Sequence, residues 1–178
     1  MMLMEEKFDY STEATKRVAV PADTYQQLSQ FLYHEARLLD TRQWDAWLKL
    51  WTPDGMYWIP RSRDQQSPYD ALSLCWDDDV LRRVRMRILD SPRRWSQQPR
   101  SYASRLIGNV TVDGTDSDGC LLVRSVIHMT EWRRETMFHR AGSCVHKLVA
   151  DGDSWKIKLK RVDLIDCDGA YEAIELYM

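Results

Sequence analysis

The chain has 178 residues, a length that fits one domain with a substantial core. Its formal net charge is −2 at pH 7, and the arginine-rich stretch 82–87 is offset by aspartates on both sides. A nucleic-acid-binding protein more often shows a basic excess on one face, so we do not expect that function. No apolar run approaches the roughly 20 residues that a membrane-spanning helix needs.

Cysteine and aromatic usage narrow the class further. The four cysteines form no Cys-x-x-Cys pair and no signal peptide is evident, so we expect free thiols in a reducing cytoplasm. Eight Trp and eight Tyr stand against three Phe. Such side chains combine large apolar area with a polar group, which suits subunit interfaces as well as cores.

The first half of the chain predicts helices. Residues 1–20 lack periodicity and are expected to form an extended arm, followed by a single domain over residues 21–178. A first helix is predicted from Pro21 with Asp23 as its cap, and its apolar face comprises Tyr25, Leu28, Leu32, Ala36 and Leu39. A second helix is predicted from Asp40, with an apolar stripe at Trp44, Trp47, Leu48 and Trp51, and it ends at Pro53 and Asp54-Gly55.

A short strand, a loop and a third helix are predicted next. Residues 56–60 read as the strand, residues 61–70 as the loop, and residues 71–76 as a further strand. Asp77 is expected to cap the third helix, which Pro92 ends, and its apolar stripe is Val80, Val84 and Ile88 with Leu81 beside it.

The second half predicts an antiparallel meander over residues 102–112, 120–132, 143–149 and 155–164. In the last strand Trp155, Ile157 and Leu159 alternate with three lysines that are expected to face solvent, and the apolar set then shifts to Val162 and Leu164. Such a shift predicts a β-bulge near Lys160-Arg161. Helices followed by a meander indicate the α+β class, with a curved antiparallel sheet wrapped around the helices as a cone.

Incomplete ligand sets argue against a metal or cofactor site in this chain. Cys144-Val145-His146 resembles half of a Rieske site, but Cys167 lacks the His that the second half requires. His34-Glu35 begins like a zinc-protease helix, but position 38 is Leu. No nucleophile motif or phosphate-binding loop occurs either, so no catalytic, cofactor-binding or metal-ligating residue is predicted.

One enzymatic alternative remains, in which the cone encloses an acid–base pocket of an isomerase or dehydratase. The residues that could line such a pocket are Tyr33, His34, Asp40, Tyr57 and His128. The competing interpretation is a cone filled by its many aromatic side chains.

Several segments in order resemble the β subunits of aromatic-ring-hydroxylating dioxygenases. They are Phe31-Leu32-Tyr33-His34-Glu35-Ala36-Arg37-Leu38-Leu39-Asp40, Trp44-Asp45-Ala46-Trp47-Leu48, Tyr57-Trp58-Ile59-Pro60, Asp78-Asp79 with the helix at 81–89, Ser96-Gln97-Gln98-Pro99-Arg100-Ser101, and Asn109-Val110. The resemblance covers about residues 23–165, and the segment at 96–101 looks most like members acting on benzoate, anthranilate or terephthalate. One departure is that relatives often have His after the Arg of the first long strand, where this chain has Arg105-Leu106.

The resemblance implies a cystatin-like cone, the fold class of nuclear transport factor 2, ketosteroid isomerase and scytalone dehydratase. It implies a small structural subunit in aromatic-acid catabolism whose partner is a large α subunit. That partner would carry the Rieske [2Fe-2S] centre and a mononuclear Fe(II), in an α3β3 assembly with a trimer of β subunits. A reductase, with or without a ferredoxin, would supply electrons from NADH. Trp58, Arg61 and Arg100 are the candidate interface residues, with Trp58 in the core and solvated arginines as the alternative.

Overall fold

A curved sheet forms the centre of the molecule. The computed structural model describes residues 8–91, 100–169, 174 and 176–178. Six strands of this described part pair in the order β2-β1-β6-β5-β4-β3. Their bounds are β1 (Trp51–Ile59), β2 (Cys75–Asp77), β3 (Tyr102–Thr115), β4 (Leu121–Arg133), β5 (Thr136–Asp151) and β6 (Ser154–Leu164). Neighbouring strands are antiparallel except β1 and β6, which are parallel. The predicted α+β class is therefore confirmed, with a mixed sheet.

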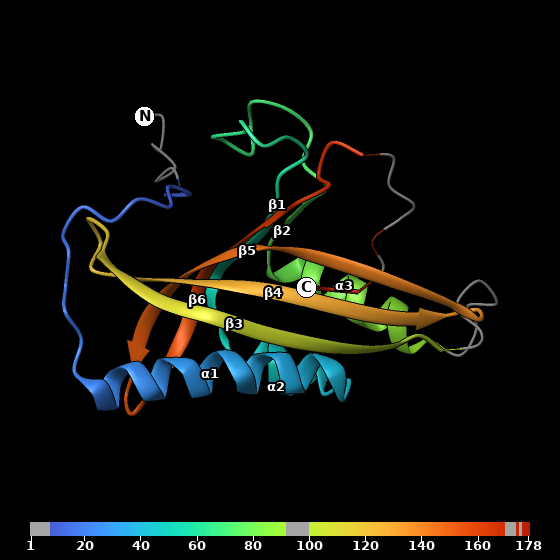
Figure 1. Cartoon of the computed structure of the whole chain (residues 1–178), viewed down its shortest axis with the longest axis horizontal. Helices are drawn as coiled ribbons and strands as arrows, with labels where there is room; N and C mark the ends of the chain where they lie inside the picture. The colour runs from blue at the N-terminus through green and yellow to red at the C-terminus, as the bar shows by residue number, and fades with distance from the viewer. Residues whose placement is uncertain (1–7, 92–99, 170–173, 175) are drawn as a thin grey trace, which may run out of the picture.

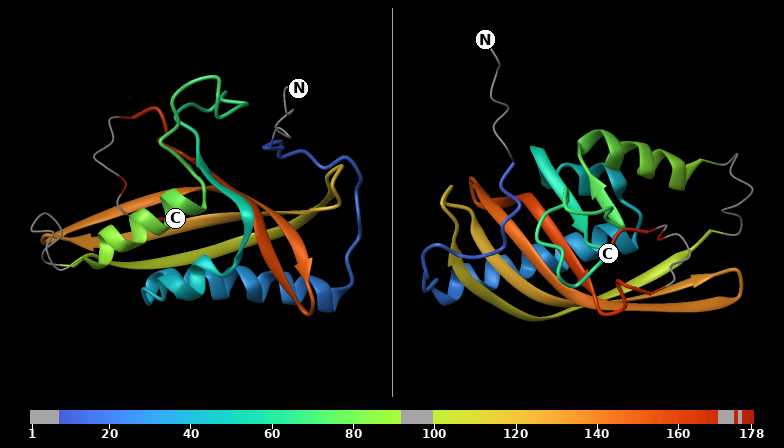
Figure 2. Two further views of the ribbon diagram at one scale, coloured as in Figure 1. Left: turned by 180° about the vertical axis from the view of Figure 1, so that it is seen from behind. Right: turned by 90° about the horizontal axis from the view of Figure 1, so that it is seen from above.

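Three helices of the described residues cover the inner face of this sheet: α1 (Ala22–Asp40), α2 (Trp44–Leu48) and α3 (Asp79–Asp90). Figure 1 shows α1 running along the sheet below β3, and α3 behind the long strands. The core between the two layers is rich in aromatic side chains, among them Trp47, Trp51 and Tyr57. No helix of the described residues lies on the opposite face of β3, β4 and β5 (Figure 2).

The apolar face predicted for α1 is largely confirmed, but its predicted cap is wrong. Leu28, Leu32, Ala36 and Leu39 are buried, whereas Tyr25 is 42% exposed and donates from its hydroxyl to Val110 O at 2.9 Å. Pro21 occupies the N-cap position without a side-chain hydrogen bond. Asp23 lies in the first turn, where its negative charge interacts favourably with the helix dipole but its side chain does not cap the helix.

The boundary between α1 and α2 also differs from the prediction. Asp40 ends α1, and α2 begins only at Trp44. The Asp40 carboxylate accepts hydrogen bonds from Arg105 rather than from the next helix. Pro53 and Asp54-Gly55 lie inside β1, where the pairing with β6 shifts between Trp51 and Met56. Such an irregularity is one of the few places where a sheet tolerates proline.

The buried side of α3 is not the predicted stripe. Asp78, not Asp77, caps the helix and accepts from Leu81 N at 2.8 Å. Arg82, Met86 and Leu89 are buried, whereas Val80 is 65% exposed. Arg82 turns inward because its guanidinium stacks 4.1 Å from the Trp51 ring centroid and donates to Gly55 O at 2.5 Å. Pro92, the predicted end of the helix, lies outside the described residues.

The strands follow the predicted meander with shifted bounds. The loop predicted at residues 61–70 contains no helix or strand, and the strand predicted at 71–76 shrinks to Cys75–Asp77. The bulge of β6 lies at Lys158, since Leu159 pairs with Lys147 and Ile157 with Leu148. It precedes the predicted position by two residues and turns Lys160 inward, so the expectation that Lys160 faces solvent is wrong.

Residues 8–20 lie outside the named strands and helices but contact the domain. The ring centroids of Phe8 and Trp76 are 6.0 Å apart, and Lys16 forms an isolated bridge with Thr115. These contacts fix one end of the arm against the short strand β2 and the other against β3. The division into an arm at 1–20 and one domain at 21–178 stays a prediction.

Candidate functional site

Three charged side chains meet in the interior between α1 and the sheet. Glu35 of α1 accepts from Lys160 Nζ at 2.8 Å on Oε1, and its Oε2 lies 3.0 Å from His146 Nε2. Each of the three residues is only 2% exposed. Trp47 Nε1 donates to Glu35 Oε1 at 3.2 Å, so hydrogen bonds surround the carboxylate. We call Glu35, His146 and Lys160 the interior cluster.

Mutual stabilisation shifts the pKa values within the interior cluster. Burial alone would raise the pKa of Glu35, but Lys160 and His146 outweigh burial and lower this pKa to about 2. Burial alone would lower the pKa of His146, but Cys144 and Glu35 outweigh it and raise this pKa to about 9. At neutral pH the cluster therefore holds a carboxylate between two cations.

A second buried ion pair lies on the same inner side of the sheet. Arg105 Nη1 of β3 is 2.5 Å from Asp40 Oδ1, and the Arg105 side chain is 1% exposed. Nearby, Asp77 accepts from the Tyr177 hydroxyl at 2.7 Å and from Arg85 Nε at 2.5 Å. Burial and the charge of Asp77 raise the pKa of Tyr177, which keeps its hydroxyl protonated.

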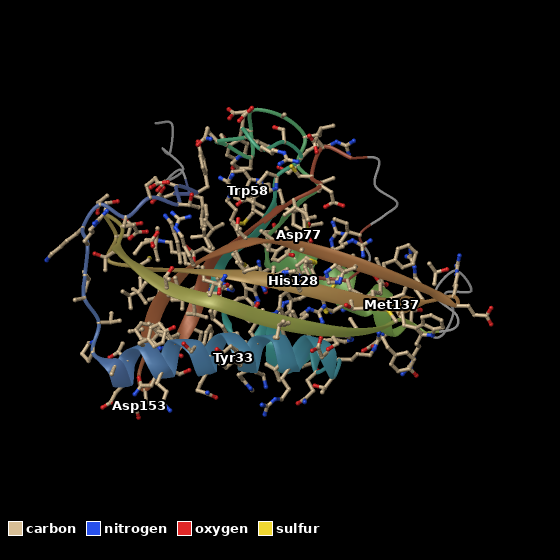
Figure 3. All side chains as sticks on the ribbon, viewed as in Figure 1. Tyr33, Trp58, Asp77, His128, Met137 and Asp153 are labelled. Carbon is tan, nitrogen blue, oxygen red and sulfur yellow. The ribbon has the colours of Figure 1, made fainter. Side chains whose placement is uncertain are left out.

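The interior does not bring together the residues of the alternative acid–base pocket of an isomerase or dehydratase. Tyr57 is fully buried and Asp40 is paired with Arg105, but Tyr33 and His34 lie on the exposed side of α1. His128 of β4 is exposed on the outer face of the sheet, opposite to the face that carries the interior cluster; Figure 3 labels Tyr33 and His128. A cavity of about 20 Å³ lies beside Tyr57, Arg85 and Tyr177, which is room for a single water molecule.

The Cys144-Val145-His146 segment does not fit an iron–sulfur cluster. Cys144 Sγ is 3.8 Å from His146 Nδ1, and both side chains are buried. Since the other ring nitrogen of His146 faces Glu35, neither nitrogen is open to a metal. Asp9, Asp116 and Asp118 form the one described group of three ligand side chains close enough for an ion. The Lys147 ammonium already occupies that place, 2.6 Å from Asp9 Oδ2 and 3.0 Å from Asp116 Oδ2.

The three candidate interface residues lie in different environments. Trp58 is fully buried: its Nε1 donates to Ser73 Oγ at 2.9 Å, and the Arg161 guanidinium lies 4.3 Å from its ring centroid. This placement matches the core alternative for Trp58 within the single chain. Arg61 and Arg100 are exposed, one in the loop after β1 and the other just before β3.

An exposed apolar surface covers the outer face of β3, β4 and β5. We call the outer sheet patch the four side chains Tyr102, Leu106, Trp132 and Met137, which are 44% to 69% exposed. Trp132 pairs with both Tyr102 and Met137, so these three side chains form a row across three strands, and Leu106 lies on the same face four residues further along β3, opposite His128. A groove of about 570 Å³, lined in part by Pro60, Arg63 and His128, continues it toward the loop after β1.

Sequence reasoning missed the interior cluster. Glu35 falls on the same helical face as Leu28, Leu32 and Leu39, which is an available signal for a buried charge. Its partners are 111 and 125 residues away along the chain, and no local pattern joins them.

Known proteins share both the sequence and the fold. The chain is 30% identical over 165 residues to the β subunit of toluate 1,2-dioxygenase from Pseudomonas putida, covering 86% of this chain and 97% of that one. The crystal structure of the β subunit of benzoate 1,2-dioxygenase from Burkholderia mallei superposes with a TM-score of 0.65 at 25% identity, covering 90% and 99% of the two chains. Naphthalene 1,2-dioxygenase with bound indole gives a TM-score of 0.72 at 20% identity over 90% of this chain and 88% of that one.

The expected cone fold is confirmed by a more distant structure. A protein assigned as a scytalone dehydratase from Novosphingobium aromaticivorans has a TM-score of 0.57 at 13% identity, covering 85% of this chain and 91% of that one. The model of the family described as ring hydroxylating beta subunit matches residues 34–168, which is most of the chain. The protein therefore belongs to the family of ring-hydroxylating β subunits.

Proposed function

We propose that this chain is the small subunit of a multicomponent dioxygenase that acts on an aromatic acid of the benzoate or toluate type, and that its role is to hold the assembly together. The relatives at 30% and 27% identity, which act on toluate and benzoate by name, support the substrate class. The filled interior of the cone supports a structural rather than a catalytic role.

The observation that carries the assembly role is the outer sheet patch. Isolated exposed apolar residues are ordinary, but a row of three large ones with a fourth on the same sheet face favours a protein contact. We assign this patch to the large subunit. Arg100 precedes Tyr102 at one end of the patch, and Arg61 lies next to Pro60 at the groove, so both arginines are proposed rim contacts.

The cofactors are proposed to reside on the large subunit. These are the Rieske [2Fe-2S] centre and the mononuclear Fe(II) of the family, in an α3β3 assembly in which β subunits contact one another and a reductase supplies electrons. The paired state of His146 and the burial of all four thiols in this chain support that division.

The proposed location is a bacterial cytoplasm. The four free cysteines fit a reducing compartment, and relatives occur in Pseudomonas putida and Acinetobacter baylyi. In the part of the chain that the structure describes, no helix is long and apolar enough to cross a membrane.

Co-expression with a neighbouring large subunit tests the proposal. Leu106→Glu, which puts a charge on the patch, is expected to weaken association with the large subunit by roughly tenfold or more in mass photometry. The matched control is Leu72→Glu, because Leu72 is 88% exposed but lies in the loop between β1 and β2. Equal affinities of the two variants for the large subunit would overturn the assignment of the patch to that subunit. If Leu106→Glu weakens only the association between β subunits, the patch is instead a contact between copies of this chain.

A further inference from the structure

Residues Leu176–Met178, which we call the terminal segment, lie inside the cone. Tyr177 is 5% exposed and Met178 fully buried. The Tyr177 ring sits between two aromatic walls, with its centroid 4.9 Å from that of Trp47 and 4.7 Å from that of Tyr57. In the right-hand view of Figure 2 the end of the chain lies between the curved sheet and α3. The terminal segment thus fills the interior of the cone between Trp47 and Tyr57.

Two buried cations bind main-chain oxygens of the terminal segment. Arg105 Nε donates to Tyr177 O at 3.2 Å, and Lys160 Nζ donates to Met178 O at 2.7 Å. The Met178 N–H donates to the Tyr57 hydroxyl at 3.0 Å. The segment therefore presents an aromatic ring and two oxygen acceptors to the surrounding domain.

These cations do not depend on the terminal segment for their position. Asp40 pairs with Arg105 and Glu35 pairs with Lys160, so both would remain charged and in place without it. Without the segment, however, each cation would lack one acceptor. A buried donor without an acceptor is costly, which makes an incoming oxygen ligand favourable.

Contacts with side chains of the domain, rather than pairing with a β-strand, keep the terminal segment in place. Ile174 and Leu176–Met178 belong to no helix or strand. A segment held in this way can detach in a local opening while the sheet stays intact. With the segment in place, the adjoining cavity of about 20 Å³ is too small for an organic molecule.

We propose that the cone interior is a binding site for a small aromatic carboxylate, which the terminal segment of the same chain occupies until it is displaced. The ligand ring takes the slot between Trp47 and Tyr57, and its carboxylate takes the place of the main-chain oxygens on Arg105 and Lys160. A neutral aromatic ligand fills the slot but brings no charged acceptor to replace the main-chain oxygens on the two cations. The site lies within this chain and does not depend on the proposed role in assembly.

The decisive variant lacks residues 176–178. Benzoate and its neutral isostere benzamide are titrated against it, and binding is measured by calorimetry and by the fluorescence of Trp47 and its neighbours. We expect benzoate to bind about tenfold more tightly than benzamide, the difference that a charged hydrogen-bond partner typically makes. Lys160→Met in the same background is expected to remove this preference, and the intact chain is expected to bind benzoate at least about tenfold more weakly than the shortened chain.

A second variant decides the question if the shortened chain fails to fold. Tyr177→Ala in the full chain empties the aromatic slot but leaves the main-chain oxygens on Arg105 and Lys160, so it is expected to bind p-cresol and not to prefer benzoate over benzamide. Leu28→Ala, two turns before Glu35 on α1, is the control for a cavity at another buried position. Failure of Tyr177→Ala to bind p-cresol, or equal affinity of a folded shortened chain for benzoate and benzamide, would overturn the proposal.

Discussion

Glu35 Oε2 lies 3.0 Å from His146 Nε2, and both residues are only 2% exposed. The pair joins the middle of α1 to β5 across a core that is largely apolar. Because Lys160 binds the other oxygen of the same carboxylate, removing Glu35 leaves two buried cations without their anion.

Glu35→Gln is expected to destabilise the fold by about 3 to 5 kcal/mol, the usual cost of breaking a buried ion pair from one side. The amide keeps the shape of the side chain but leaves Lys160 and His146 without an anion. Urea unfolding at pH 7 measures the change. Glu13→Gln is the control, because Glu13 is 89% exposed where it faces Arg124. A cost for Glu35→Gln no larger than that of the control would show that the cluster contributes no stability.

His146 makes stability depend on pH on the alkaline side. Its pKa is raised from 6.5 to about 9 in the folded protein, so its contribution is complete below pH 6.5 and disappears as pH rises to 9. The intact protein should lose about 3 kcal/mol more than His146→Gln between pH 6 and pH 9.5. Unfolding curves at both pH values test this, with His139→Gln on the exposed sheet face as the control. Parallel pH profiles for the intact protein and His146→Gln would contradict the raised pKa.

The contribution of Glu35 to stability depends on pH in the opposite direction, on the acidic side. Its folded-state pKa of about 2 lies below the ordinary 4.5, so its contribution is present above pH 4.5 and is lost as pH falls toward 2. The intact protein is therefore expected to lose stability on acidification from pH 5 to pH 3, and Glu35→Gln to lose less. The difference between their unfolding free energies over that interval is the measurement, and an unchanged difference would contradict the lowered pKa.

Hydrophobic periodicity predicted the elements well where apolar residues do the packing. The spacing of apolar residues alone predicts the buried face of α1 and the four long strands, because burial of Leu, Val and Ile at those positions removes apolar surface from water. The same reasoning failed for α3. Arg82 counts as polar in any pattern, yet it is fully buried, with its guanidinium stacked on the Trp51 ring and its Nη1 donating to Gly55 O.

Local sequence patterns could not predict the interior cluster for a related reason. Lys160 belongs to an alternating strand and was expected to face water, but the bulge at Lys158 turned it inward toward Glu35. Tyr177 and Met178 carry no periodicity, and only the folded chain places them between Arg105 and Lys160. The resemblance to a family predicted the cone fold, but it did not predict the contacts in the interior of the cone.

Asp40→Asn is expected to cost about 3 kcal/mol of folding stability, because it leaves the guanidinium of Arg105, 1% exposed, without a counterion. Asp168→Asn is the matched control. It disrupts an ion pair with Arg63 whose side chains are both 65% exposed, and such surface pairs contribute less than about 1 kcal/mol. Thermal unfolding of the two variants provides the comparison. Similar midpoints would mean that Arg105 keeps its place through the main-chain oxygen of Tyr177 alone.

Two glycines in long strands should respond in opposite directions to alanine. A Cβ on Gly142 of β5 would lie 2.5 Å from Asp163 O of the neighbouring strand, so Gly142→Ala must push β5 and β6 apart and is expected to cost about 1 to 3 kcal/mol. A Cβ on Gly108 of β3 meets nothing within 4 Å, and Gly108→Ala is expected to be neutral or to stabilise by up to about 1 kcal/mol, since it restricts the unfolded chain. Denaturant midpoints measured in parallel test both. Gly142 also lines the groove beside the outer sheet patch. If the Gly142→Ala chain is destabilised but still folds and binds the large subunit, the effect of this substitution on stability is independent of subunit binding.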